Sequence, residues 1–124
     1  MGIRITPSIL NADFSRLDEE ISRIAAVSDL LHLDVMDNVF VPNFTFDFEQ
    51  AAAIIASSPV AVDSHLMIAD VDLLAPAYAH AGSASVTIHA EASSAISATL
   101  RAIKAEGSRA GLALKPGSSI ADYA

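Results

Sequence analysis

Three ionisable side chains interrupt stretches of the sequence that are otherwise apolar. His32 and Asp34 lie within the run 30–36, and His65 lies within the run 60–67. Alternate residues of a β-strand point to one face and neighbouring strands lie roughly 4.8 Å apart, so His65 on an adjacent strand would reach both. Two imidazoles and a carboxylate are the ligand set of a catalytic zinc or non-haem iron site. The alternative is a hydrogen-bonded core cluster, in which Asp34 accepts from His32 or from a backbone amide.

Several weaker candidates share the face on which these three residues are expected. Met36 and Met67 have the same inward parity as Asp34 and His65, although core packing is the ordinary explanation for a methionine. Asp63 has that parity too, and it either orients a ligand or is a hydrogen-bonded core carboxylate.

Two further candidates stand at the ends of apolar runs. Ser8 ends the first run and faces the same mouth, where a lone serine more often satisfies a local backbone group. His89 ends the fourth run and could line the pocket. Asp37 and Asn38 follow the second run, where turn formation is the usual role of these residue types.

Strands and helices must alternate to position these side chains. Five apolar runs of strand length occur, at residues 3–10, 30–36, 60–67, 84–89 and 110–114. They start about 25 to 30 residues apart, the spacing of one strand-plus-helix unit, and their apolar character predicts parallel strands covered on both faces. Helices are predicted in the four intervals, with Asp13 as a cap of the first and with Gly82 and Gly107 as stops.

This alternation predicts a parallel sheet, either doubly wound or closed into a barrel. The glycine patterns of nucleotide-binding loops are missing, so a (β/α)₈ barrel, the TIM barrel, is favoured. Such a barrel needs about 250 residues. We therefore expect the 124 residues to form one domain, a truncated half-barrel of about five parallel strands and four helices.

Composition excludes several classes of function. The chain has 7 Lys and Arg against 15 Asp and Glu, a net charge of −8, which argues against nucleic acid and anionic membranes as partners. It has no Cys, so disulfides, zinc thiolates and thiol nucleophiles are excluded. The N-terminus lacks the features of a signal peptide, and a cytoplasmic location is expected.

Four sequence motifs point to a known family. They are Pro7 to Phe14, His32 to Asp37 followed by Phe40 to Asn43, Asp63 to Ile68, and His89 to Glu91. In this order and at this spacing they resemble the ribulose-phosphate 3-epimerase family over essentially the whole chain. Asn38 stands where many members have glycine, which is a tolerable turn variant.

The resemblance implies an isomerase of the pentose phosphate pathway that interconverts D-ribulose 5-phosphate and D-xylulose 5-phosphate on a (β/α)₈ barrel. It implies a divalent metal, zinc or iron in most members and manganese or cobalt as alternatives, bound by His32, Asp34 and His65. Asp34 matches a catalytic acid/base aspartate. The positions implied to bind the phosphorylated ketopentose are Ser8, Met36, His65 and Met67.

The family's second acid/base aspartate and its glycine-rich phosphate loops lie on the sixth to eighth strands, which we expect to lie beyond Ala124. Three readings of the function therefore stand side by side. The first is the epimerase itself. The second is a catalytically incomplete half-barrel that associates into a homo-oligomer through its strand edges and an apolar inner face. The third retains the metal but acts on a related ketose phosphate, or hydrolyses its substrate with metal-bound water.

Overall fold

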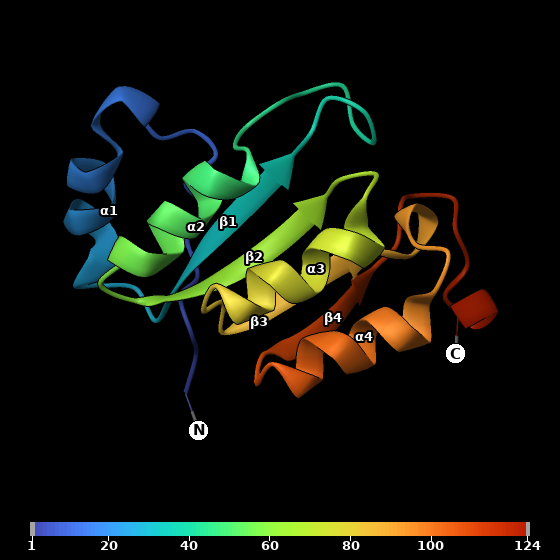
Figure 1. Ribbon diagram of the computed structural model, residues 1–124. Coiled ribbons are helices and arrows are strands. Elements are labelled where there is room, and N and C mark those ends of the chain that lie inside the picture. Colours follow the sequence, from blue (N-terminus) through green and yellow to red (C-terminus); the bar gives the residue numbers. More distant parts are fainter. Residues whose placement is uncertain (1, 124) are drawn as a thin grey trace.

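A computed structural model describes residues 2–123 and has four parallel strands that alternate with four α-helices in that part of the chain (Figure 1). The strands are β1 (Leu30–Met36), β2 (Ala61–Met67), β3 (Ser85–His89) and β4 (Arg109–Ala113). The helices are α1 (Leu17–Ala25), α2 (Phe48–Ser57), α3 (Val71–His80) and α4 (Ile96–Ala105). Short 3₁₀ turns are η1 (Phe14–Arg16), η2 (Ala90–Ala92) and η3 (Ile120–Tyr123). The predicted alternation is confirmed, and the α/β arrangement is consistent with part of a TIM barrel.

The sheet has the order β1-β2-β3-β4, so each strand pairs with the next strand along the chain. Figure 1 shows α2, α3 and α4 lying across one face of this sheet, with α1 at the outer edge of the helix layer. This is the order in which successive right-handed βα units build the wall of a barrel.

The expected first strand, within residues 3–10, is not a regular strand. It runs parallel to β1 but pairs through the single bridge between Ser8 and His32. His32 N donates to Pro7 O and Ile9 N donates to His32 O, while Leu30 N donates to Ile5 O. The next rung would need Pro7 to donate a backbone hydrogen bond to Leu30, and proline has no N–H. Proline therefore interrupts the ladder where the apolar pattern predicted it would continue.

The hydrophobic core lies between the sheet and the helices. Alternate residues of the strands, among them Leu33, Leu66 and Ile88, are fully buried, and they belong to one cluster with helix residues such as Ala75 and Ile103. Burying each large side chain contributes about 1.5–3 kcal/mol, which fixes the helices on this face.

The opposite face of the sheet is polar, not apolar as expected. The residues that pair in register along it include His32 with Asp63, Asp34 with His65, and His65 with Thr87. They are mostly half-buried, in contrast to their fully buried neighbours. The prediction of strands apolar on both faces was wrong. The polar residues stand singly at alternate positions, so each run as a whole is mostly apolar although one of its faces is polar.

The residues predicted to begin and end helices are found at helix ends. Asp13 caps η1 by accepting from Ser15 N, and Gly82 and Gly107 end α3 and α4 with φ of 116° and 92°, in the left-handed region that favours glycine. Asn38 has a φ of 59°, a turn conformation that asparagine tolerates.

The described helices are all too short to cross a lipid bilayer.

Candidate metal centre

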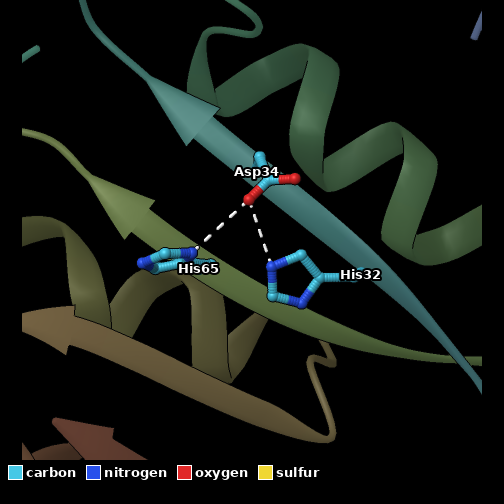
Figure 2. A group of neighbouring side chains, drawn as sticks. All are labelled: His32, Asp34 and His65. Atoms are coloured by element: carbon cyan, nitrogen blue, oxygen red, sulfur yellow. Dashed lines mark hydrogen bonds and ion pairs between the residues drawn. The ribbon is translucent and has the colours of Figure 1, made fainter. Parts of the chain in front are cut away.

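Strand register brings together the three residues predicted to bind a metal. His32 and Asp34 lie on β1, and Asp34 pairs in register with His65 on β2. Figure 2 shows both imidazoles directed at the carboxylate: Asp34 Oδ1 lies 3.1 Å from His32 Nε2 and 3.4 Å from His65 Nδ1. One donor atom from each residue lies within 4.8 Å of the other two.

These separations fit a shared metal ion. Two ligand atoms that each bind a divalent ion at about 2.1 Å lie roughly 3.0–3.4 Å apart when they occupy adjacent coordination positions. The two measured distances fall in this range. Two imidazole nitrogens with one carboxylate oxygen also suit zinc or iron, and they leave further positions open. The residues present therefore fit the group that the family implies.

Asp63 orients His32. Its Oδ2 lies 2.9 Å from His32 Nδ1, and its Oδ1 accepts a hydrogen bond of 2.6 Å from Ser85 Oγ. Hydrogen bonds to Asp34 and Asp63 raise the pKa of His32 to about 10, against the opposing effect of burial. The hydrogen bond from His32 in turn lowers the pKa of Asp63. Of the two roles expected for Asp63, orientation of a candidate ligand fits this geometry, because the contact leaves Nε2 directed at Asp34.

Three side chains, those of Ser8, His32 and His65, contact the Asp34 carboxylate. Its side chain is buried, and Ser8 Oγ donates to Oδ2 at 2.5 Å, so the two carboxylate oxygens have separate partners. Burial alone would raise the pKa of Asp34, but hydrogen bonds from His32, His65 and Ser8 outweigh it and lower the pKa well below its usual range. Asp34 is therefore ionised at neutral pH.

One residue of the site was missed by sequence reasoning. Thr45 Oγ1 donates to the backbone oxygen of Asp34 at 2.7 Å and accepts from Met36 N at 2.9 Å. It bridges the residues on either side of Val35 and so fixes the end of β1. Thr45 lies in a loop, and its sequence neighbours gave no signal of this contact.

The loop after β1 is fastened to the end of β2. Asp37 Oδ1 accepts from the backbone N–H groups of Val39 and Phe40, and Oδ2 accepts from Ala69 N at 2.7 Å. Asp37 therefore forms the turn that was predicted, and in addition it ties two loops together at the same end of the sheet.

The remaining predicted residues surround the centre. Met36 and Met67 pair in register two residues beyond Asp34 and His65, toward the C-terminal ends of their strands. Met36 also lines an open pocket of about 290 Å³ with Leu10 and Phe44. His89 Nε2 lies 2.8 Å from His65 Nε2, so His89 extends the polar cluster to β3.

The fold and the site together define an α/β protein of barrel type, with a candidate metal centre near the C-terminal ends of two adjacent parallel strands. Sequence comparison refines this class. The family model described as "Ribulose-phosphate 3 epimerase family" matches residues 4–124. The chain therefore belongs to the ribulose-phosphate 3-epimerase family, which confirms the resemblance seen in the motifs.

Curated relatives carry the same description. A ribulose-phosphate 3-epimerase of Mycobacterium leprae is 44% identical over 123 residues, which are 99% of this chain and 54% of the relative. Ribulose-phosphate 3-epimerase 1 of Cupriavidus necator is 44% identical, with 96% and 50% covered, and the Rhodobacter capsulatus protein is 46% identical, with 94% and 52% covered. The chain thus spans about half the length of the curated relatives it matches.

Proposed function

We propose that this chain contributes the metal-binding and proton-transferring residues of a ribulose-phosphate 3-epimerase, which interconverts D-ribulose 5-phosphate and D-xylulose 5-phosphate by proton transfer at C3. The observation that carries the proposal is Asp34, a buried carboxylate that lies between His32 and His65. The relatives that match nearly the whole chain are named for this reaction.

Asp34 is the catalytic residue of the proposal. A base is needed to remove the proton at C3, which is acidified by the neighbouring ketone, and an ionised carboxylate can accept it. Ser8 Oγ donates to Oδ2 and so fixes the direction of this oxygen, which is the one proposed to accept the proton because Oδ1 faces the two histidines. Re-protonation from the opposite side of the carbon inverts the configuration.

The proposed metal ligands are His32 Nε2, Asp34 Oδ1 and His65 Nδ1. A divalent ion held there, zinc or iron with manganese or cobalt as alternatives, would act as a Lewis acid that stabilises negative charge developing on the substrate's oxygen atoms. Asp63 keeps His32 in the orientation that this requires.

Four side chains are proposed to contact the sugar phosphate. Ser8 offers its hydroxyl beside Asp34 and His65 presents the face of its ring there, while Met36 and Met67 form an apolar rim at the strand ends. Ser8 is paired to β1 by its backbone bridge to His32, which supports a fixed rather than a mobile contact.

The wider setting is part of the same proposal. We place the protein in the cytoplasm and in the pentose phosphate pathway, as a homo-oligomer that binds neither nucleic acid nor membranes. The net charge of −8 supports the last two statements, because it disfavours nucleic acid and anionic membrane surfaces as partners. Exposed apolar side chains such as Val39 and Phe44 support self-association.

Proton exchange at C3 tests the chemistry most directly, because it needs only one base. The purified protein with zinc or ferrous ion is incubated with D-xylulose 5-phosphate in D₂O, and deuterium at C3 is followed by NMR. We expect exchange that Asp34→Asn abolishes and that the exposed-site control Asp18→Asn retains. Exchange that persists in Asp34→Asn would contradict the assignment of the base.

Two companion measurements separate the alternatives. Replacing both His32 and His65 by Ala should remove bound metal, and unchanged metal content would exclude them as ligands. Comparing D-xylulose 5-phosphate with a ketohexose 6-phosphate tests the substrate, since faster exchange with the hexose would favour the epimerase of a related ketose phosphate. Absence of exchange with both, in a folded and metal-loaded protein, would favour the catalytically incomplete half-barrel.

A further inference from the structure

We propose that His89 and Glu91 are positioning residues of the metal centre, which set the tautomer of His65 and reverse their own hydrogen bonding when a metal ion binds. The inference rests on the metal centre of the proposed function and extends it to β3 and η2. Neither residue is a proposed ligand.

The contact between the two histidines is a hydrogen bond between ring edges. Their Nε2 atoms are 2.8 Å apart, the rings lie within 20° of parallel, and the ring centroids are 4.9 Å apart. The centroid separation is about the nitrogen separation plus the two ring radii, so the rings meet end to end. One of the two nitrogens must carry a hydrogen atom and the other must offer a lone pair.

Asp34 decides which nitrogen donates in the metal-free protein. His65 Nδ1 faces Asp34 Oδ1 at 3.4 Å, and a carboxylate can only accept. A His65 ring that carries a single hydrogen therefore has it on Nδ1 and offers Nε2 as a lone pair. His89 must then donate from its Nε2, which leaves His89 Nδ1 with a lone pair.

That lone pair faces another acceptor. His89 Nδ1 lies 3.7 Å from Glu91 Oε1, beyond hydrogen-bond range, and both atoms are buried without a hydrogen-bond partner among the described residues. Glu91 is fixed from its other oxygen, which accepts from Lys115 N and Ser118 Oγ. Two acceptors held close together and unsatisfied are costly, and such a pair calls for an explanation.

Metal binding would satisfy both atoms. A metal on His65 Nδ1 requires a lone pair there, so the hydrogen of this ring moves to Nε2 and is donated to His89. His89 then carries its hydrogen on Nδ1, directed at Glu91. A shortening of about 0.7 Å from the present 3.7 Å would complete this bond.

The change conserves the number of protons on the two rings. The hydrogen between the rings passes from His89 to His65, the one on His65 Nδ1 leaves to water, and His89 Nδ1 takes one from water. Each ring carries one hydrogen before and after. Glu91 thereby stabilises the metal-loaded arrangement and leaves the metal-free one unsatisfied.

Nitrogen NMR of the histidine side chains tests the inference directly. Long-range proton–nitrogen spectra of ¹⁵N-labelled protein distinguish the protonated from the unprotonated nitrogen of each ring, before and after addition of Zn²⁺. We expect His65 to change from Nδ1–H to Nε2–H, and His89 from Nε2–H to Nδ1–H, at the same zinc concentration. A His89 tautomer that stays the same while His65 Nδ1 binds zinc would overturn the proposal.

Variants test whether the arrangement affects affinity. We expect Glu91→Gln and His89→Leu to weaken zinc binding about 10–100-fold in competition with a chromophoric chelator, as for other groups that orient metal ligands. His89→Gln, which retains an acceptor oxygen, should retain affinity within a few-fold. The matched control is Glu106→Gln, because Glu106 pairs with His80 at 3.1 Å on the exposed surface. The zinc affinity of Glu106→Gln should equal that of the wild type.

The outcomes separate this inference from the proposed function. Zinc bound by His32 and His65, with equal affinity in Glu91→Gln and in the wild type, overturns the positioning role and leaves the metal centre intact. A wild type that binds no zinc overturns both. Thermal unfolding of each metal-free variant shows that it is folded, and if His89→Leu does not fold, His89→Gln and Glu91→Gln carry the test.

Discussion

The carboxylate of Asp63 fixes the orientation of the His32 ring. Asp63 Oδ2 lies 2.9 Å from Nδ1, so Nε2 is the nitrogen directed at Asp34. The ring is already oriented before any metal binds. Metal binding therefore loses no further entropy in ordering this ring, which favours affinity.

We therefore predict that Asp63→Ala lowers zinc affinity by about 10–100-fold, because the ring loses the acceptor that orients it. Chelator competition measures the change. Asp18→Ala, at an exposed carboxylate of α1, is the control. Equal affinity in Asp63→Ala and the wild type would show that Asp34 alone orients His32.

At the scale of elements, one aspartate joins two helices. Asp72 lies in the first turn of α3, and its carboxylate accepts hydrogen bonds from Ser93, Ser94 and Thr99 at the start of α4. Burial would raise the pKa of Asp72, but these hydrogen bonds outweigh it and lower the pKa to about 2. The carboxylate thus replaces the cap that Ala95 cannot provide from its own side chain.

Because this pKa is lower in the folded protein than in the unfolded chain, the stabilisation is complete above about pH 4 and is lost as the pH falls toward 2. Asp72→Asn should cost about 2 kcal/mol of unfolding free energy at pH 7, and the difference from the wild type should shrink in that pH range. Urea unfolding at several pH values measures it. The control is Asp70→Asn, since Asp70 makes no capping hydrogen bond to α3. A difference independent of pH would contradict the prediction.

The Thr87 side chain of β3 lies against Gly111 of β4. A Cβ atom built there would lie 2.6 Å from Thr87 Oγ1, so Gly111 makes room for the Thr87 side chain on the adjacent strand. We predict that Gly111→Ala destabilises the protein by about 1–3 kcal/mol, as overpacking does. Thr87→Ala should recover most of that loss in the double variant, measured as a double-mutant cycle by thermal unfolding. Additive effects would mean that the two side chains do not clash.

Sequence periodicity predicted the helices and most of the sheet, because the buried face alternates regularly with apolar residues such as Leu33 and Leu66. The proximity of Asp34 and His65 followed from parity and adjacency alone. The failure at residues 3–10 came from one missing N–H, at Pro7, which a count of apolar residues does not register. The contact of His65 with His89 could not be predicted, since the register pairs His65 with Thr87 and His89 lies two residues further along.

At the scale of the whole molecule, the placement of residues 1–124 as the N-terminal part of a barrel stays a prediction, as does its assembly. Val39 and Phe44, two apolar side chains in the loop after β1, are 77% and 58% exposed. We predict self-association at micromolar concentrations, measured by sedimentation equilibrium, and its weakening in Val39→Glu/Phe44→Glu. Leu73→Glu, at an exposed position of α3, is the control. A monomer at all concentrations would contradict this prediction.

The order of the strands in the sheet is the same as their order along the chain, and this bears on how the site forms during synthesis. Pairing of β1 with β2 joins residues only 31 positions apart, so the entropy lost in closing the loop is smaller than for strands further apart along the chain. His32, Asp34, Asp63 and His65 all belong to this first pair. The proposed ligands therefore come together in the pairing of β1 with β2 alone, and a metal ion bound to them would stabilise that pairing.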